Sequence, residues 1–365
     1  MRITELDTPA LVIDLDIMEA NLRRVADYAR SHDLRLRPHT KTHKTPALGR
    51  QQLELGAAGL TVAKVSEAEV MLGSGVQDLL VAYPVIGRKK IERLVEVARQ
   101  TKVTVSLDNL VTARLISEVA RQERVEIHVL VEADVGLGRV GIEPGAELVA
   151  LGRAVSNLPY LNLAGVAFYP GHIKSMDESG AEAVEKLSET VSTMVKQFQA
   201  AGMKLDIVSG GSTPTLFESH KVDGLNEIRP GTYIFNDRNT VECGACRWED
   251  CAASIMVTVV STARQGQIII DGGSKTFSSD RLSTTGEPTF GRLVDAPEAV
   301  FTKMNEEHGF VDMRRAREAN FQVGDRVRVI PNHICVAVNL HEQVYGVRNG
   351  EVEQVWKVEG RGKLQ

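Results

Sequence analysis

Residues 161–213 read LNLAGVAFYPGHIKSMDESGAEAVEKLSETVSTMVKQFQAAGMKLDIVSGGST, and this stretch decides the fold class. Its first part, LNLAGVAFYP, is a short apolar run that predicts a buried strand. A long helix is expected from about Ser179 to Ala201, and a second apolar run, KLDIVSGGST, follows it. Strand, helix and strand in succession are typical of a parallel sheet covered by helices.

The same alternation extends toward the N-terminus. Strand-like runs, each followed by a helix-like segment, are ALVIDL (10–15), LRLRPH, GLTVAKV, DLLVAYPV, KVTVSLDN and VEIHVLVEAD. The run EIRPGTYIFND comes close behind KLDIVSGGST. Roughly eight such units favour a closed (β/α)8 barrel over an open doubly wound sheet.

The pattern changes after about Cys243. Apolar, strand-like runs with few helical stretches between them are SIMVTVVSTA, QIIIDGG, DRVRVIPNHICVAVNL and EQVYGVRNGEVEQVWKV. The pair Asn349-Gly350 between two alternating runs predicts a hairpin. Because 365 residues exceed one ordinary core, we expect a barrel over residues 1–245 and a β-rich domain over 246–365. The first few residues could join the β domain.

Composition narrows the class of protein. The net charge of −5, from 43 basic and 48 acidic residues, gives no electrostatic reason to expect nucleic acid or a membrane as partner. The N-terminal MRITELDTPALVIDLD carries charges where a signal peptide needs an apolar run, and no stretch approaches the ~20 apolar residues of a membrane span. We therefore expect a cytoplasmic protein, and four cysteines do not indicate a disulfide framework.

Two loops carry a possible cofactor site. In RLRPHTKTHKTP, Lys41 follows a strand and would lie at the barrel mouth, where a lysine could form an imine with an aldehyde cofactor. On local evidence a solvated basic loop is the alternative. In SGGST, Ser209 to Thr213, backbone N–H groups and hydroxyls could cradle a phosphate, although many such loops are only turns. A lysine and a phosphate cradle at one mouth are what pyridoxal 5′-phosphate (PLP) requires.

Two arginines also follow strand ends. Arg139, in VEADVGLGRVGI, could bond a cofactor's phenolate oxygen, or could be a surface arginine after a turn. Arg229 begins RPGTYIFND, which ends on Asn236 and Asp237.

The β-rich part offers a possible metal site. In PNHICVAVNLHE, His333 and Cys335 are two residues apart on an expected strand, so both side chains would face one side. Imidazole and thiolate suit Zn²⁺, and Mn²⁺ less well, but a buried His and Cys in a sheet is the alternative. The C-x2-C-x4-C series ending at Cys251 could be half of a zinc knuckle, yet no second pair follows, so we interpret its members as free thiols.

These motifs together resemble a known family. DTPALVIDLD, RPHTKTHK, KVSEAEV, VEADVGLGRVGI, AFYPGHI, SGGSTPT, RPGTYIFND, EEHG and PNHICVAVNLHE occur in the order seen in PLP enzymes of alanine-racemase-like fold. Within that fold they are similar to the D-threonine aldolase and D-serine dehydratase group. The resemblance implies an α/β fold, with a PLP-binding (β/α)8 barrel and a C-terminal β-rich domain, and a homodimer.

The resemblance also implies roles for individual residues. Lys41 would be the Schiff-base lysine, and Arg139 would bond the phenolate side of the ring. Tyr169 would contact the ring or its nitrogen, and Arg229 would lie near the pyridine nitrogen. The remaining cofactor contacts would be Gly210, Gly211, Ser212, Thr213 and Tyr233. His333 and Cys335 would bind a divalent metal ion, Mn²⁺, Zn²⁺ or Mg²⁺.

The implied activity is cleavage of a β-hydroxy-D-amino acid such as D-threonine to glycine and an aldehyde. Metal-bound hydroxide or His172 would be the base. A dehydratase acting on D-serine or D-3-hydroxyaspartate is the alternative, and it is favoured by H-x-C where some D-threonine aldolases have H-x-D. A racemase would need a second base, for which Tyr345 is the only tyrosine in the β-rich part. A non-catalytic PLP carrier would lack that part altogether.

Overall fold

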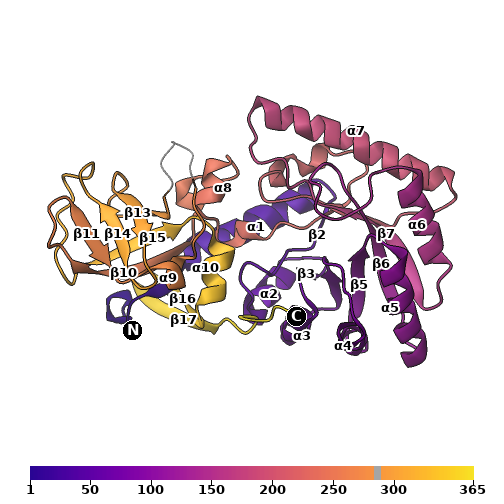
Figure 1. The fold of residues 1–365 in the computed structure, drawn as a ribbon, viewed down its shortest axis with the longest axis horizontal. Helices are drawn as coiled ribbons and strands as arrows, with labels where there is room; N and C mark the ends of the chain where they lie inside the picture. Colours follow the sequence, from indigo (N-terminus) through magenta and orange to yellow (C-terminus); the bar gives the residue numbers. More distant parts are fainter. Residues whose placement is uncertain (283–288) are drawn as a thin grey trace. The chain divides into compact units, whose positions relative to one another are not determined.

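The computed structural model describes residues 1–282 and 289–365, and the chain divides into two compact units (Figure 1). The barrel unit comprises Arg23–Lys41, Thr45–Gly231 and Gly362–Gln365. The β unit comprises Met1–Leu22, Thr42–Lys44 and Thr232–Arg361.

The barrel unit is built on an eight-stranded parallel sheet in the order β2-β9-β8-β7-β6-β5-β4-β3. Its strands are β2 (Arg35–Leu36), β3 (Leu60–Val62), β4 (Asp78–Val81), β5 (Lys102–Leu107), β6 (Ile127–Ala133), β7 (Leu161–Phe168), β8 (Ile207–Gly210) and β9 (Glu227–Ile228). Beyond β2, a parallel bridge between His39 and Thr61 joins the two ends of the sheet. The predicted (β/α)8 barrel is therefore confirmed.

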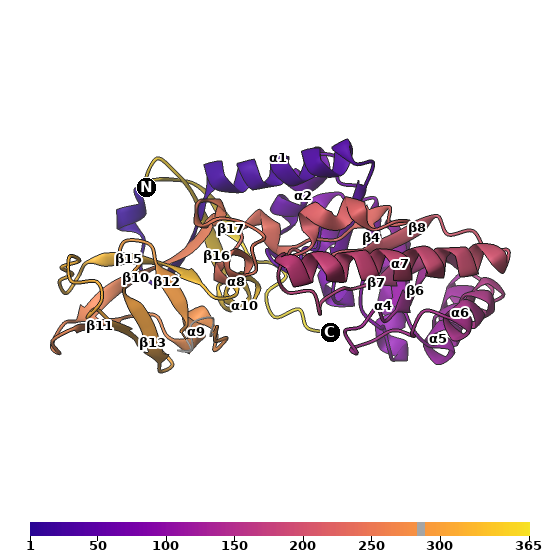
Figure 2. The ribbon, with the colours of Figure 1, turned by 90° about the horizontal axis from the view of Figure 1, so that it is seen from above.

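Helices cover the barrel sheet (Figure 2). They are the second half of α1 (Leu15–Ser31), α2 (Pro46–Glu54), α3 (Val65–Met71), α4 (Arg88–Ala98), α5 (Leu110–Glu123), α6 (Ala146–Ser156) and α7 (Glu178–Ala200), with the short turns η2 (Leu72–Ser74) and η3 (Leu216–Lys221). In α4, Ile91, Leu94 and Val95 are fully buried, a spacing that places them on one helical face. The expected helix from Ser179 to Ala201 is α7, whose N-cap Asp177 accepts the Gly180 N–H.

The barrel interior depends on close approach between β7 and β8. Leu80, Leu130, Ala164, Ala167 and Ile207 form one buried cluster there. Gly165 has a φ of +155°, and a Cβ on it would lie 1.8 Å from the carbonyl oxygen of Ile207. Only glycine allows the two strands to pair at this point.

The β unit contains a mostly antiparallel nine-stranded sheet. Its strands are β1 (Ala10–Asp14), β10 (Ala253–Ser261), β11 (Gln267–Ile270), β12 (Gly291–Leu293), β13 (Val300–Met304), β14 (Gly309–Asp312), β15 (Arg326–Pro331), β16 (Gln343–Arg348) and β17 (Glu351–Lys357). Its short helices and turns are η1 (Ile3–Glu5), η4 (Thr232–Ile234), α8 (Arg238–Glu242), η5 (Trp248–Asp250), α9 (Ser274–Phe277) and α10 (Ile334–Leu340).

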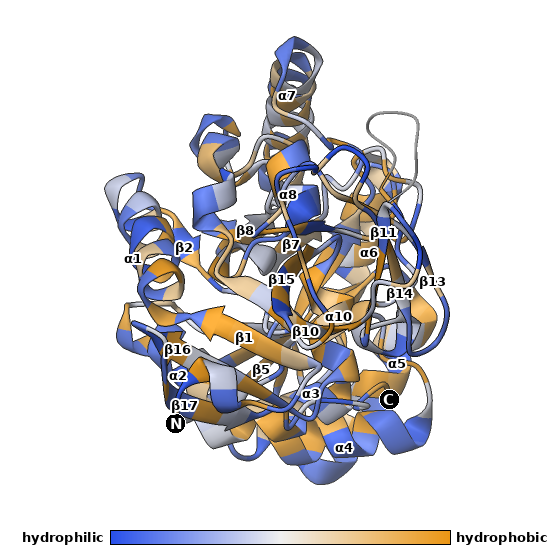
Figure 3. Ribbon diagram, turned by 90° about the vertical axis from the view of Figure 1, so that its left-hand side faces the viewer, coloured by the Kyte–Doolittle hydropathy of each residue, from blue (hydrophilic) through white to orange (hydrophobic). Residues whose placement is uncertain are grey.

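Two expectations for the β unit were wrong. The run ALVIDL is not a barrel strand: it forms β1, which pairs with β10 and β16 and is coloured as strongly hydrophobic in Figure 3. The run DRVRVIPNHICVAVNL is not one strand, because β15 ends at Pro331 and α10 begins at Ile334. The hairpin prediction is confirmed, since β16 and β17 meet at Asn349-Gly350, both with positive φ.

No helix in the described part of the chain is long and apolar enough to cross a membrane. The four cysteines, Cys243, Cys246, Cys251 and Cys335, are free. This agrees with the prediction that they form no disulfide framework.

Candidate active site

The residues predicted to hold a cofactor follow the carboxyl ends of the barrel strands. Because parallel strands end at one face of a barrel, their following loops meet at that face. In the barrel unit these residues are Lys41 after β2, Arg139 after β6, Tyr169 and His172 after β7, Gly211, Ser212 and Thr213 after β8, and Arg229 after β9. Tyr233 is different, because it lies buried in η4 of the β unit.

Lys41 has an exposed side chain at the end of a fixed backbone segment. Its N–H donates to Nδ1 of His39 at 3.3 Å. The hydroxyl of the preceding Thr40 donates to the carbonyl oxygen of Thr61 at 3.1 Å. These bonds hold the backbone while leaving the amine of Lys41 accessible to a ligand.

The loop after β8 is shaped by glycine and by hydroxyl bonds. A Cβ on Gly210 would lie 2.3 Å from the ring of Phe168, and Gly211 has a φ of +86°. The N–H of Ser212 donates to Oγ1 of Thr215 at 3.2 Å, and the two hydroxyls lie 3.1 Å apart. Within the described residues, the backbone N–H groups of Gly211 and Thr213 donate to no other group. Such N–H groups can bind a phosphate.

Arg139 and Tyr169, which follow β6 and β7, lie in contact with each other. The guanidinium of Arg139 lies over the ring of Tyr169, 4.7 Å from its centroid. A Cβ on Gly171 would lie 2.3 Å from the ring of Tyr169, so glycine leaves the space that the ring occupies.

His172 lies beside a turn organised by Asp134. The Asp134 carboxylate accepts the N–H groups of Gly136, Leu137 and Gly138 at 2.9–3.1 Å. Burial acts to raise the pKa of Asp134, but these N–H bonds and the charge of His172 lower it overall. A Cβ on Gly136 would lie 3.4 Å from the His172 ring, so the imidazole packs directly on the turn. The signal of this turn in the sequence is D-x-G-x-G, Asp134 to Gly138, and it does not by itself indicate His172 as the neighbour.

Arg229 supplies a buried donor at the same face. Its Nη2 donates to the carbonyl oxygen of Phe168 at 2.8 Å, while its Nε is buried and has no partner among the described residues. Burial lowers the pKa of Arg229, and the nearby carboxylates of Glu132 and Glu227 oppose that effect. An unpartnered buried N–H is costly unless a ligand accepts it, so the arrangement fits a cofactor ring nitrogen.

A buried ion-pair network that the sequence had not indicated contacts β8, the strand that precedes the loop of residues 211–213. Arg37 is 1% exposed; its Nε lies 2.9 Å from Oε2 of Glu227 and its Nη1 lies 2.8 Å from Oδ1 of Asp78. Ser209, in β8, donates to the other oxygen of Glu227 at 2.8 Å. Burial lowers the pKa of Arg37, but the two carboxylates raise it overall. The network therefore connects β2, β4, β8 and β9.

The predicted metal pair lies in the β unit at the start of α10. His333 is the N-cap residue and Cys335 lies buried in the first turn. Their side chains are hydrogen-bonded, although they are not on a strand as expected. Asp237, which is fully buried, places Oδ2 3.2 Å from Nδ1 of His333 and accepts the N–H of Ile334 at 2.9 Å. Sequence reasoning had named Asp237 without this role.

Chemically, the pair is a soft donor set with an oriented imidazole. Burial lowers the pKa of His333, but Cys335 and Asp237 together raise it to about 11. The Cys335 sulfur also lies 3.2 Å from the hydroxyl of Thr42 and 3.8 Å from that of Thr232. Because the carboxylate is beside Nδ1, Nε2 is the nitrogen suited to a metal. Over residues 1–282 and 289–365 there is no cluster of three or more candidate metal ligands.

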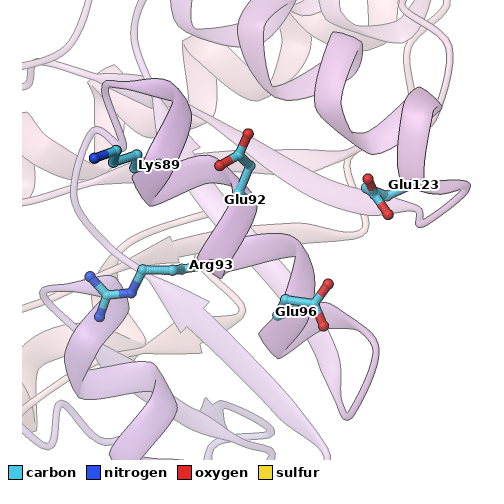
Figure 4. Close-up of a pocket in the computed structure, with 5 residues that line it drawn as sticks. All are labelled: Lys89, Glu92, Arg93, Glu96 and Glu123. Carbon is cyan, nitrogen blue, oxygen red and sulfur yellow. The ribbon is translucent and has the colours of Figure 1, made fainter.

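A surface hollow elsewhere in the barrel unit is unrelated to these residues. Figure 4 shows its lining side chains, which are Lys89, Glu92, Arg93, Glu96 and Glu123. Arg93 is paired with Glu69, and Glu123 with Arg99. Solvated ion pairs of this kind contribute little stability and mark no binding site by themselves.

Two family models match the chain. Residues 13–239 match the alanine racemase N-terminal domain, and residues 252–347 match the serine dehydratase domain. The chain is 34% identical to a D-threonine aldolase of Arthrobacter sp, covering 99% of this chain and 94% of that protein. It is 32% identical to a 3-hydroxy-D-aspartate aldolase of Paracoccus denitrificans, covering 99% and 93%.

Solved structures of an aldolase and a dehydratase also resemble this chain. A D-threonine aldolase from Filomicrobium marinum superposes with a TM-score of 0.94 at 30% identity, covering 100% of this chain and 98% of that one. A D-threo-3-hydroxyaspartate dehydratase from Delftia sp. HT23 gives 0.89 at 30% identity, covering 98% of each. An alanine racemase of Clostridium difficile 630, at 16% identity and a TM-score of 0.74, shares the fold over 97% of this chain and 100% of that one.

Proposed function

We propose an activity for this chain on the premise that it belongs to the PLP-dependent lyase family of D-threonine aldolases, 3-hydroxy-D-aspartate aldolases and D-hydroxyaspartate and D-serine dehydratases. The proposed activity is metal-dependent cleavage of a β-hydroxy-D-amino acid, such as D-threonine, to glycine and an aldehyde. The observation that carries it is the similarity to D-threonine aldolases over nearly the whole chain, at 34% identity and a TM-score of 0.94.

PLP, when bound, supplies an electron sink for the bond-breaking step. In the proposal Lys41 would hold its aldehyde carbon, and Gly210, Gly211, Ser212 and Thr213 would bind its phosphate. Arg139 and Tyr169 would contact the ring, and Tyr233 would be a further contact. The buried Nε–H of Arg229 would donate to the ring nitrogen, to which a guanidinium does not give up its proton.

His172 is the proposed base for the β-hydroxyl. Asp134, held ionised by three backbone N–H groups, organises the turn against which this imidazole packs. The hydroxyl proton moves to His172, the C–O bond becomes the carbonyl of the departing aldehyde, and the electrons of the Cα–Cβ bond stay with the glycine fragment. That fragment regains at Cα the proton that His172 took up, directly or through solvent, so atoms and charge balance.

His333 and Cys335 are proposed to hold one divalent metal ion, which would acidify a bound hydroxyl or water. Asp237 orients the imidazole, and two protein ligands leave coordination positions open. Supporting the proposal, a cysteine-to-alanine mutant of the Delftia dehydratase was solved in a metal-free form. Zn²⁺ suits the donor set best, with Mn²⁺ and Mg²⁺ as the other candidates.

Dehydration of D-3-hydroxyaspartate or D-serine is the second candidate, and a specific observation favours it. Mutants of the Delftia dehydratase place a histidine and a cysteine two residues apart, the spacing of His333 and Cys335 here. In that reaction Lys41 would remove the proton from Cα and hydroxide would leave from Cβ. The products are a keto acid and ammonia instead of glycine and an aldehyde. In either case a homodimer in the cytoplasm remains our prediction.

One experiment tests both reactions. Purified protein is incubated with PLP, D-threonine, D-serine or D-3-hydroxyaspartate, and Mn²⁺ or Zn²⁺, and both aldehyde and keto acid are measured. Acetaldehyde and glycine from D-threonine, absent with Lys41→Ala, support the aldolase. Keto acid without aldehyde supports the dehydratase. If no β-hydroxy-D-amino acid yields either an aldehyde or a keto acid, the proposed function is refuted.

A further inference from the structure

A cluster of aromatic side chains lies outside the residues assigned so far and involves η3, which follows the phosphate loop, residues 210–213, in the chain. It joins the barrel-unit half of α1 to η3, the turn that follows the loop. The hydroxyl of Tyr28 lies 2.9 Å from Nδ1 of His220 and accepts the backbone N–H of His220 at 3.1 Å. His32 stacks on His220 with ring centroids 4.1 Å apart, and Phe217 meets the Tyr28 ring edge-on at 5.2 Å.

A continuous series of hydrogen bonds leads from this cluster to the phosphate loop. Ser219, which precedes His220, donates its hydroxyl proton to the carbonyl oxygen of Thr215 at 3.0 Å. Thr215 in turn accepts the N–H of Ser212. A Cβ on Gly211 would lie 3.4 Å from Oγ of Ser219, so the loop rests directly on this residue. Ser212, Thr215 and Ser219 are all at most 5% exposed.

Tyr28 makes two contacts with His220. The backbone N–H of His220 can only donate, so it uses a lone pair of the hydroxyl oxygen. The same hydroxyl lies 2.9 Å from Nδ1 of His220, and the tautomer of the imidazole decides which of the two atoms donates. Burial raises the pKa of Tyr28, so the proton remains on the oxygen near neutral pH. Tyr28 therefore fixes His220 through both its backbone and its ring.

We propose that Tyr28 is a positioning residue for the PLP phosphate, holding η3 through His220 so that the backbone N–H groups of Gly211 and Thr213 stay directed at the anion. The inference rests on the proposed function, since it assigns the loop after β8 to the cofactor phosphate. Tyr28 does not touch the cofactor. Its hydroxyl acts through His220, Ser219 and Thr215.

A residue that positions the phosphate loop affects the affinity for ligands that carry a phosphate, whereas a residue with a general structural role affects all ligands alike. Loosening the loop weakens ligands that carry a phosphate and spares those that lack one. PLP and pyridoxal share the aldehyde and ring that Lys41, Arg139 and Arg229 would bind, and differ only in the phosphate. Comparing the two ligands isolates the loop.

The test is equilibrium titration of metal-loaded, cofactor-free protein with PLP and with pyridoxal, followed by the absorbance of the adduct at Lys41. Tyr28→Phe keeps the ring contacts and removes only the hydroxyl. Loss of one to two net hydrogen bonds predicts a roughly three- to tenfold rise in the Kd for PLP. The Kd for pyridoxal should change by less than about twofold, because that ligand uses no loop N–H. Inorganic phosphate should compete less well against PLP in the variant than in the wild type.

Companion variants keep the test decisive. His220→Asn can place an amide oxygen near the position of Nδ1 and should retain PLP affinity, whereas His220→Leu should lose it as Tyr28→Phe does. His32→Ala removes a stacking partner without touching the hydroxyl and is the matched control. An unchanged PLP affinity in both Tyr28→Phe and His220→Leu, or an equal loss for pyridoxal, overturns the inference. Failure of the wild type itself to bind PLP would instead overturn the proposed function.

Discussion

Asp237→Asn tests the proposed metal pair by changing one buried group next to it. Oδ2 of Asp237 faces Nδ1 of His333 and accepts the N–H of Ile334, while Oδ1 accepts the N–H of Thr240 at 2.9 Å. An amide of the same shape has only one accepting oxygen, so either orientation of Asn leaves its NH₂ against a backbone donor. If the NH₂ faces His333, Nδ1 must accept and Nε2 carries the proton, which prevents Nε2 from binding metal.

The expected loss of metal affinity is about 10- to 100-fold, or about 1.4–2.8 kcal/mol. The upper part of that range is expected, because Asp237 is fully buried and water cannot replace it. Zn²⁺ affinity of chelator-stripped protein is measured by competition with a chromophoric chelator. Asp271→Asn is the matched control, since Asp271 accepts the N–H of Thr258 at 2.7 Å in the same unit. Equal Zn²⁺ affinity in both variants and the wild type, or Zn²⁺ binding that survives His333→Ala, would refute the reasoning.

Three further predictions address stability, thiol chemistry and metal choice. Burial acts to raise the pKa of Asp78, but Arg37 and Lys102 lower it overall, below its usual 3.8. The ionised carboxylate therefore stabilises the fold above about pH 4. That contribution is lost as the pH falls through the folded-state pKa. Asp78→Asn should therefore cost about 1–3 kcal/mol at pH 7 and flatten the acid side of the urea-denaturation profile, and parallel profiles would contradict this. The hydrogen bond from Cys251 lowers the pKa of Cys246, whereas burial raises the pKa of Cys243. Iodoacetamide should therefore label Cys246 first, and Cys251→Ala should slow that labelling. Peptide mass spectrometry measures both rates. Cys335→Asp replaces a soft ligand by a hard one and should shift bound metal from Zn²⁺ toward Mn²⁺ in an equimolar mixture, with an unchanged ratio counting against Cys335 as a ligand.

The barrel could be predicted from the sequence because its strands are buried on both faces. Such strands are continuous apolar runs, and LNLAGVAF and KLDIVSG stand out between amphipathic helices. The run ALVIDL has the same appearance, yet it pairs with β10 and β16. An apolar run shows that a strand is buried and not which sheet buries it, and the partners of β1 lie more than 200 residues away in the sequence.

Some residues of the candidate site are positioned by their own loop, and others by residues far away in the sequence. Candidate residues that depend on their own loop, such as Lys41 and Ser212, can be proposed from motifs that follow strands. The helix at Ile334 could not, because ICVAVNL is rich in β-branched residues and its first N–H is accepted by Asp237, nearly a hundred residues earlier. Arg37 reads as an ordinary charged residue until Glu227 and Asp78 surround it.

The two candidate reactions differ in which proton the protein removes first. An aldolase takes the proton of the β-hydroxyl, and a dehydratase takes the proton of Cα. The barrel unit carries a candidate for each, since His172 is oriented by the turn of Asp134 and Lys41 has an accessible amine on a fixed backbone. A metal held by His333 and Cys335 would assist either reaction, because a metal that acidifies a hydroxyl also helps hydroxide to leave. The choice of reaction must therefore come from how the substrate's Cα–Cβ and Cα–H bonds are presented to the cofactor, and the metal ligands alone do not determine it.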